Sequence, residues 1–416
     1  MGRNFRPSLC GCHMDMNDDR DMYAGELKEL LRENLSRIIA GEYSAHKTDP
    51  IFITRESYPN KTRIDNLPLY PQEIPQVILS WAKLDPKLKR APEDVLVLDL
   101  ETTGLGRGGT LAFMIGLGYY EGGEFFVEQL FLPDPDAEEH SFERLQELCE
   151  SHSLLITFNG KSFDLPVLES RLLYHQIWLD LRKMEHLDLL HIARRLWKRK
   201  LPSCALETIE YYVLGQIRDQ ELDIEGGDIP QTYYHYLMTG EADLIKRIFV
   251  HNHHDILHTA ALFALICDSC VYPPVSGMDP RIDYHALARL YLSQNQAHIA
   301  RQILIDMLAQ GMVTPDALYE LGLIYKRDKQ YSEALDSFQI AADLQHPLAM
   351  VECAKLYEKM KHYDPALNLS KRVLSLEEGR YKPNARLISE LEKRIFRLEK
   401  KIAKSLQSLT SPQEKE

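Results

Sequence analysis

The spacing of apolar and polar residues divides the chain into regions with different predicted structure. Residues 22–42 carry apolar side chains at helical spacing and predict an amphipathic helix, which is followed by proline-rich sequence with little strand character up to Pro92. From residue 95, short apolar runs alternate with helical patterns, which predicts a mixed α/β sheet. Beyond residue 277 the pattern is helical throughout.

The α/β region begins with a valine- and leucine-rich run that predicts a buried strand. Two more strands are expected next, joined by the hairpin signal Glu121-Gly122-Gly123, so the first three strands of the sheet are predicted to be antiparallel. A helix, a fourth strand and further helices complete the region. The predicted strands are 95–105, 111–119, 125–132 and 154–158, and the predicted helices are 137–151, 186–197, 205–214 and a long one after Gly240.

Two acids interrupt the first strand. Asp99 and Glu101 are two residues apart, and because side chains alternate across a strand, both project from the same face of the sheet. A pair of carboxylates on an otherwise apolar strand is costly unless a cation neutralises it. Oxygen ligands favour hard divalent ions, so the pattern predicts Mg²⁺ or Mn²⁺ at this face.

Two further acids are candidates for the same site. Asp164 follows the fourth strand at the start of a helix, where it could also serve only as an N-cap. Asp255 lies on the long last helix of the region, and His251 precedes it by one turn, so both side chains can reach one site.

Histidines surround this last acid. His251, His254, Asp255 and His258 fall on one face of the predicted helix, whereas His253 points away. Three interpretations follow. Asp255 belongs to the carboxylate site, or His254 and His258 bind a transition metal, or the histidines are ordinary solvated residues.

The motifs Asp99-Leu100-Glu101-Thr102-Thr103-Gly104-Leu105, Asn159-x-x-x-Phe163-Asp164 and His251-x-x-x-Asp255, in this order, resemble those of the DEDD exonuclease superfamily, which has an RNase H-like fold. The resemblance implies that two divalent ions are bound by Asp99, Glu101, Asp164 and Asp255. It also implies that His251 orients or deprotonates the attacking water. The residues implied to hold the terminal nucleotide are Thr102, Thr103, Gly104, Leu105, Asn159 and Phe163.

The chain departs from the superfamily pattern at one position. DEDD enzymes place a tyrosine four residues, or a histidine five residues, before the last aspartate, whereas here His251 takes the tyrosine position and Val250 the other. Imidazole can orient or deprotonate water near neutral pH. Residues 187–197 and 201–210 are similar to the YprB-like branch of bacterial RNase H-like proteins. Asp188 of this chain is expected to be a helix cap or a supporting group rather than a metal ligand.

The helical region contains an internal repeat. A small residue and a tyrosine recur at offsets of 34 and then 32 residues, and an alanine recurs further along each unit. This pattern resembles the tetratricopeptide repeat and implies a protein partner, with a generic helical bundle as the alternative. The recurring residues are Ala288 and Tyr291, Gly322 and Tyr325, Ala354 and Tyr357, and Ala300, Ala334 and Ala366. Residues 389–405 predict a capping helix.

These patterns predict four parts: a leader, an RNase H-like α/β domain, an all-α TPR-like repeat domain with its cap, and a polar tail. The expected bounds are 1–91, 92–273, 274–406 and 407–416, with a linker at 273–277.

Charge and cysteine content narrow the function. The net charge of −13 argues against a protein that coats nucleic acid, but a nuclease stays open because only charge along the substrate path matters. Residues 194–200 contain five cationic side chains and no acid. They are either a helix end whose cations are favoured by the helix dipole, or a patch that contacts phosphates. Seven scattered cysteines do not form a disulfide framework, and Cys10-Gly11-Cys12-His13 is either half a metal site or part of a tail.

The sequence has no membrane-spanning run and no signal peptide, so the protein is expected to be cytoplasmic. Its four acids predict a metal-dependent nuclease. By resemblance, it is a 3′–5′ exonuclease that hydrolyses single-stranded DNA or RNA with two Mg²⁺ or Mn²⁺ ions, without a membrane partner. The alternative is a weak or inactive nuclease-fold scaffold that recruits partners through the repeats. The four acids favour the first function, and the departure at His251 favours the second.

Overall fold

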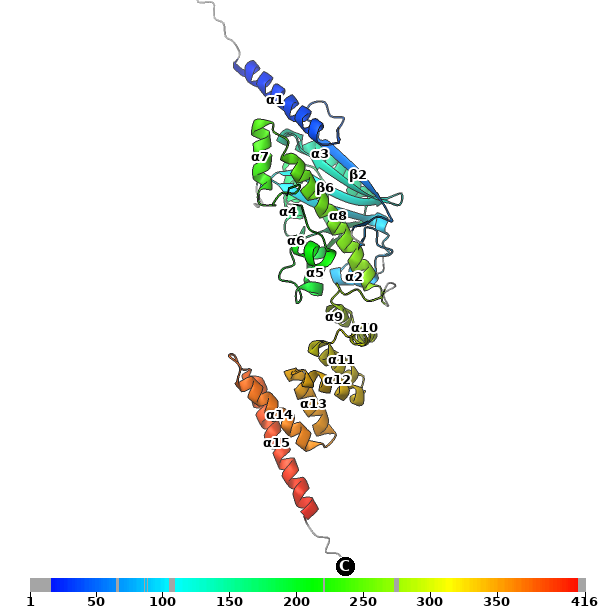
Figure 1. The fold of residues 1–416 in the computed structure, drawn as a ribbon. Coiled ribbons are helices and arrows are strands. Elements are labelled where there is room, and N and C mark those ends of the chain that lie inside the picture. The colour runs from blue at the N-terminus through cyan, green and yellow to red at the C-terminus, as the bar shows by residue number, and fades with distance from the viewer. Residues whose placement is uncertain are drawn as a thin grey trace, which may run out of the picture. The chain divides into compact units, whose positions relative to one another are not determined.

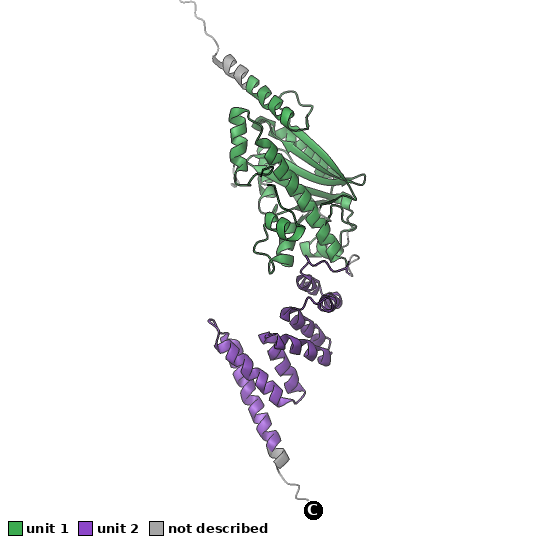
Figure 2. Cartoon of the chain, in the orientation of Figure 1, with its two compact units in different colours: residues 1–271 green, residues 272–416 purple. Residues whose placement is uncertain are grey.

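The computed structural model describes residues 16–64, 67–85, 87, 89–104, 109–219, 221–272 and 277–410, with the side chains of residues 16–24 and 407–410 left out. The chain forms two compact units, Met1–Val271 and Tyr272–Glu416 (Figure 2). Residues 273–276 of the predicted linker 273–277 lie outside the described residues, as does the Cys10-Gly11-Cys12-His13 motif.

The first unit is built on a seven-stranded mixed sheet in the order β1-β2-β7-β6-β5-β8-β9. Strands β5, β6 and β7 are antiparallel neighbours, and β5, β8 and β9 are parallel. The strands of this sheet are β1 Glu42–Tyr43, β2 Phe52–Pro59, β5 Val95–Thr102, β6 Ala112–Glu121, β7 Glu124–Phe131, β8 Leu154–Thr157 and β9 Glu185–Asp188, and β3 Arg63–Ile64 pairs separately with β4 Leu67–Pro68.

Helices flank the sheet (Figure 1). The long helix α8 packs across β5, β6 and β7, and α3 and α4 pack on β6. The helices of this unit are α1 Met16–Ile38, α2 Gln76–Ala82, α3 Glu138–Ser151, α4 Asp164–Tyr174, α5 Leu189–Trp197, α6 Leu206–Ile209, α7 Ile229–Thr239 and α8 Ile245–Cys270, and a π-helical turn follows α6 over Glu210–Leu214. The prediction of an α/β domain with an antiparallel three-strand start is confirmed.

Strand alternation divides β5 between two environments. Leu98 and Leu100 join a buried core with Phe142 of α3 and Leu168 of α4. Asp99 and Glu101 point to the opposite face, where α8 lies. The first strand therefore carries the core on one side and the acids on the other.

Two glycines of β6 let α8 come close to the sheet. A Cβ atom at Gly118 would lie 2.7 Å from the Ile256 side chain, and one at Gly116 would overlap the Asn252 amide. Because neither glycine has a side chain, α8 can pack closely against β6. Its residues Asn252 and Asp255 thus reach the acids of β5.

The segment before Pro92 is part of the first unit, which corrects the expectation of a strand-poor leader. Strand β2 pairs with β7 along its whole length, and Leu31 and Leu35 of α1 are buried in the core. Strand β2 was not predicted because it carries no continuous apolar run. It lies near the sheet edge, and its middle residues, from Arg55 to Ser57, are exposed.

Two more elements differ from the sequence prediction. The helix expected from His186 begins only at Leu189, because Glu185–Asp188 forms strand β9 beside β8. Helix α7 was not expected. It buries Tyr233, whose ring stacks on Phe113 at a centroid distance of 4.0 Å.

The second unit consists of consecutive antiparallel helices, as a TPR-like repeat domain requires, and this prediction is confirmed. Small residues permit close packing, because a Cβ atom at Gly322 would lie 2.5 Å from the Phe338 ring. Ala300, Ala334 and Ala366 are fully buried. The helices are α9 Tyr284–Ser293, α10 Ala297–Ala309, α11 Pro315–Arg327, α12 Tyr331–Asp343, α13 Pro347–Lys359, α14 Tyr363–Glu378 and α15 Ala385–Thr410, so the helix at the capping position continues past residue 406. None of the helices in the described ranges is long and apolar enough to cross a membrane.

Candidate metal centre

Four acids meet between the sheet and α8. Asp99 and Glu101 come from β5, Asp164 begins α4, and Asp255 lies on α8. The charges of Asp255, Asp164 and Glu101 all act on Asp99, and the Asp164 carboxylate accepts a hydrogen bond from the backbone amide of Leu100, between the two acids of β5. The four predicted ligands therefore lie close enough to interact electrostatically.

Burial makes this group of carboxylates electrostatically strained. Removal from water is the largest cause, and repulsion by neighbouring acids adds to it, so the pKa of Asp99 is held well above its ordinary range. The same causes raise the pKa of Glu101 to about 8 and that of Asp164 to about 7, although His251 partly offsets the shift of Glu101. Such carboxylates gain stability when a cation neutralises them.

His251 faces the same site. One ligand atom each of Glu101, His251 and Asp255 lies within 4.8 Å of the others. The other side of the ring is held by Asp223, whose Oδ1 lies 2.8 Å from His251 Nδ1. Burial lowers the pKa of His251, but the hydrogen bond to Asp223 and the charges of Asp255 and Glu101 outweigh it and raise the pKa to about 9.

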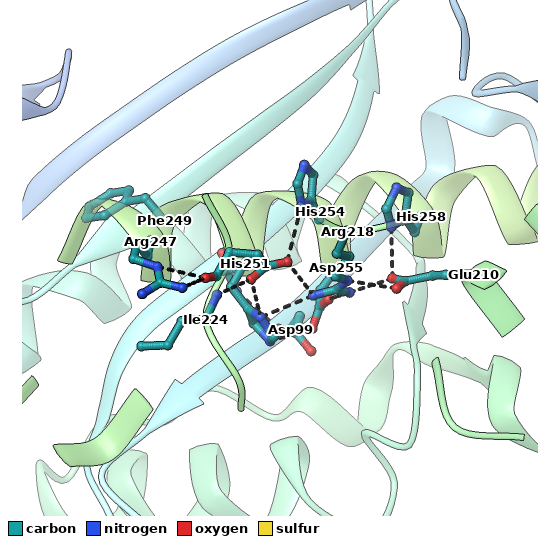
Figure 3. Close-up of polar contacts among 12 residues, drawn as sticks. Asp99, Glu210, Arg218, Ile224, Arg247, Phe249, His251, His254, Asp255 and His258 are labelled. Atoms are coloured by element: carbon teal, nitrogen blue, oxygen red, sulfur yellow. Dashed lines mark hydrogen bonds and ion pairs between the residues drawn. The ribbon is translucent and has the colours of Figure 1, made fainter. Parts of the chain in front are cut away.

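An arginine that the sequence analysis did not single out lies against Asp255. Arg218, in the loop after the π-helical turn, donates from Nη2 to Asp255 and forms a two-point contact with Glu210, with Nε–Oε2 at 2.7 Å and Nη2–Oε1 at 2.5 Å (Figure 3). Its Nη1 donates to Asp223 at 3.3 Å. A guanidinium therefore touches one of the four acids.

Glu210 is itself fixed from the other side. His258 Nδ1 lies 2.8 Å from Glu210 Oε1, and both side chains are buried. Burial alone would raise the pKa of Glu210, but hydrogen bonds from His258 and Arg218 lower it to about 2. Glu210 is thus an ionised anchor for Arg218 at neutral pH.

A chain of amides positions Asp99. Asn252 Nδ2 donates to Asp99 Oδ2 at 3.1 Å, and its Oδ1 accepts from Gln129 Nε2 at 3.0 Å. Gln129 also donates to the backbone carbonyl of Phe249 at 2.9 Å, which ties β7 to α8. Asn252 fits because Gly116 leaves space for it.

The residues expected to hold a nucleotide adjoin the acids in the sequence, after Glu101 and before Asp164. Thr102 ends β5 and donates to the Gly104 carbonyl at 2.8 Å, while the Thr103 hydroxyl accepts from the Leu111 amide at 3.0 Å. Asn159 is exposed with φ of 72°, and Phe163 directly precedes α4. Leu105 lies outside the described residues.

The other sequence candidates have structural roles. Asp188 caps α5 by accepting from the Leu190 amide at 3.1 Å and also accepts from the amides of Asn159 and Lys161, so its expected role as a cap is confirmed. His254 and His258 stack with their rings 5.4 Å apart, yet each ring faces a different acid, Asp223 and Glu210.

The basic stretch and His253 also have partners. Arg195 Nη1 donates to the Trp81 carbonyl at 3.0 Å, which joins α5 to α2. His253 pairs with the Tyr58 hydroxyl of β2 at 2.8 Å, away from the four acids, in agreement with its predicted direction.

Sequence reasoning missed Arg218, Glu210, Asp223 and Asn252. Arg218 and Asp223 lie in irregular segments, and their partners on α8 are more than 25 residues distant. Periodicity cannot identify such pairs. Asn252 alone carried a usable signal, because it directly follows His251 in the motif that contains Asp255.

The donor set fits divalent metal ions. It consists of carboxylate oxygens with one imidazole beside them, on buried and mutually repelling groups, and hard ions of this kind prefer oxygen ligands. Asp99, Glu101, Asp164 and Asp255 are the residues that would hold them. The contact of Arg218 with Asp255 places a competing cation at the same carboxylate.

Comparison with known proteins agrees with the fold and the motifs. A family model of the RNase H superfamily matches residues 96–267. YprB, an uncharacterized protein of Bacillus subtilis (strain 168), is 30% identical over 293 residues, which are 68% of this chain and 69% of YprB. A solved structure of nearly identical TPR-like repeats, from a Podosopora anserina protein named as a kinesin light chain, covers 43% of this chain and 87% of its own at 15% identity, with a TM-score of 0.26. The chain therefore belongs to the family of YprB, and its residues 96–267 match the RNase H superfamily.

Proposed function

We propose that the first unit is a divalent-metal-dependent nuclease that removes nucleotides from the 3′ end of single-stranded DNA or RNA. The observation that carries this proposal is the convergence of Asp99, Glu101, Asp164 and Asp255 from one strand and two helices onto one buried face. The match of residues 96–267 to the RNase H superfamily supports the same chemistry.

The residues divide into three roles. The four acids would bind the ions, which in such sites activate water and stabilise the leaving oxygen. Asn252 keeps the Asp99 carboxylate aimed at the site, and His251 orients the attacking water or accepts its proton once the neighbouring acids are neutralised. Thr102, Thr103, Gly104, Asn159 and Phe163, at the ends of β5 and β8, would contact the terminal nucleotide.

The second unit is proposed to bind a protein partner. TPR-like stacks present a concave groove that accepts peptides. The sequence carries the small residues that this packing needs, and the structure buries them. A partner bound there would bring the nuclease to its substrate.

The experiment that tests the nuclease is digestion of 3′-labelled and 5′-labelled single-stranded DNA and RNA with Mg²⁺ or Mn²⁺, with the wild type and Asp99→Asn compared at matched purity. We expect metal-dependent release of nucleotides from the 3′ end that Asp99→Asn abolishes. Equal activity in both proteins would assign the activity to a contaminant and contradict the proposal.

One observation favours a second candidate function. Arg218 already neutralises Asp255, as expected if the nuclease fold serves only as a scaffold for the repeats. On this view no metal binds and no strand is cleaved with either ion, while Asp99→Asn leaves partner binding unchanged. The same digestion experiment therefore separates the two functions.

A further inference from the structure

Arg218 contacts acids of two kinds. Asp255 is one of the four proposed metal ligands, whereas Glu210 and Asp223 are not. Nη2 donates to both Asp255 and Glu210 (Figure 3), and Nη1 donates to Asp223. Its side chain is only 16% exposed, so the guanidinium is a nearly buried cation at the edge of the candidate metal centre.

The anchoring of Arg218 does not depend on Asp255. The contact with Glu210 uses both carboxylate oxygens, and His258 holds Glu210 from behind at 2.8 Å. Asp223 is fixed by the Ile224 amide at 2.7 Å as well as by His251. If Asp255 turned to another cation, the guanidinium would keep this support and lose one partner only.

Charge balance indicates what would follow. When all four acids are ionised, as they would be around bound metal, they carry four negative charges, which two divalent ions would neutralise. The Nη2 group of Arg218, which now contacts Asp255, would then be available to another anion. Because Nε and Nη1 keep their contacts with Glu210 and Asp223, Nη2 is the nitrogen that could donate a charge-assisted hydrogen bond to a phosphate, which the substrate of a nuclease carries.

We propose that Arg218 and a divalent metal ion compete for the Asp255 carboxylate, and that Arg218, once displaced, contacts a phosphate of the bound nucleic acid. This inference rests on the proposed function. It makes Arg218 a substrate-contacting residue that offsets part of the charge of the empty site and engages substrate only when the metal is bound. The carboxylate site and the substrate contact are thereby coupled through one side chain.

Opposite effects on two ligands provide the test. In Arg218→Met we expect Mn²⁺ to bind about tenfold more tightly, as measured by calorimetry, because its competitor is gone. In the presence of Mn²⁺, a phosphorothioate oligothymidine should bind about tenfold more weakly, because a phosphate contact is lost. Damage to the fold would weaken both, so that result, or unchanged Mn²⁺ affinity, would overturn the proposal.

A double-mutant cycle makes the test specific for Asp255. In an Asp255→Asn background, Arg218→Met should change Mn²⁺ affinity by less than twofold, whereas an equal gain in both backgrounds would show a general charge effect and contradict direct competition. Arg218→Lys, which keeps the charge without the fork, should raise Mn²⁺ affinity above that of the wild type, although by less than Arg218→Met. This comparison with the wild type provides the measurement if Arg218→Met does not fold.

Failure of the proposed function has a different result. If Mn²⁺ does not bind to the wild type or to Arg218→Met, the metal centre itself is wrong. If Mn²⁺ binds equally to both, the metal centre stands and only the role of Arg218 is lost.

Discussion

The first unit contains two buried clusters of the same composition, a glutamate, an arginine and a histidine. In one, Arg171 holds Glu138 at 2.7 and 2.5 Å, and His175 completes the pair at 2.7 Å. In the other, Arg218 holds Glu210 at the same distances, and His258 completes it at 2.8 Å.

The two clusters differ in the groups that the arginine contacts besides its glutamate. Arg171 stacks over the Tyr174 ring, 4.5 Å from its centroid, and links α4 to the start of α3. Arg218 instead reaches two more acids, Asp223 and Asp255. The same three residue types therefore make a structural clamp in one place and part of a candidate active site in the other, and only the additional acceptors distinguish them.

The largest expected difference between the two clusters is in catalysis. Asp255→Asn, next to Arg218, should lower nucleotide release by about a thousandfold, because a proposed metal ligand loses its charge. Glu138→Gln should leave the rate per folded molecule unchanged. Single-turnover digestion of a 3′-labelled oligonucleotide measures both, and a comparable loss in Glu138→Gln would contradict the distinction.

The next difference is in stability and its dependence on metal. Arg171→Met leaves Glu138 buried without its main partner, so the free energy of unfolding should fall by about 3 kcal/mol. Arg218→Met should also be destabilised, but Mg²⁺ should restore part of the loss, because a metal ion can replace the cation at Asp255. Urea unfolding with Mg²⁺ or with EDTA measures this. Equal recovery of both variants would be evidence against a metal site beside Arg218.

The pH dependence of stability gives a smaller but signed difference. In the folded protein the pKa is raised to about 8 for Glu101, about 7 for Asp164 and about 9 for His251. The folded state then binds more protons than the unfolded state between about pH 5 and 8, so the free energy of unfolding of the metal-free protein should fall as pH rises through this window.

Arg218 counteracts this fall because its charge lowers the pKa of Glu101. In EDTA, Arg218→Met should therefore lose stability more steeply with rising pH than the wild type, whereas Arg171→Met should show the wild-type slope. Urea unfolding at pH 5.5, 7 and 8.5 gives the three slopes, and identical slopes would contradict the assignment of the buried acids.

The smallest effects are expected at the histidines. His258→Gln and His175→Gln should each lower the free energy of unfolding by about 1 kcal/mol, because one hydrogen bond to a buried glutamate is weakened. His258→Gln should also slow hydrolysis about tenfold through looser positioning of Arg218, whereas His175→Gln should not. Unfolding and turnover should be measured for both variants. Equal turnover in the two variants would argue against an effect of His258 on Arg218 through Glu210.

The sequence could predict the parts of the fold and site that are carried by local patterns. The Val-Leu run of β5 and the alternation that puts Asp99 and Glu101 on one face are readable from neighbouring residues. Asp164 and Asp255 were identifiable because each lies at a definite place on a helix with a recognisable motif. Strand β2 was missed because its exposed middle carries no apolar run, and its pairing with β7 is settled by tertiary packing.

The residues that support the four acids, such as Arg218 and Glu210, could not be predicted for a related reason. Arg218 meets Asp255 across 37 residues and Glu210 meets His258 across 48, and no repeat or spacing links them. Loop side chains acquire their roles only when the fold places their partners.

The most direct test of the central claim is a crystal structure of the wild-type protein grown with Mn²⁺, with the metal located by its anomalous signal. We predict Mn²⁺ about 2.1 Å from carboxylate oxygens of Asp99, Glu101, Asp164 and Asp255, with the Arg218 guanidinium no longer in contact with Asp255. A saturating concentration of Mn²⁺ that leaves no anomalous peak among these acids, with Arg218 still on Asp255, would contradict the metal centre and the nuclease function built on it.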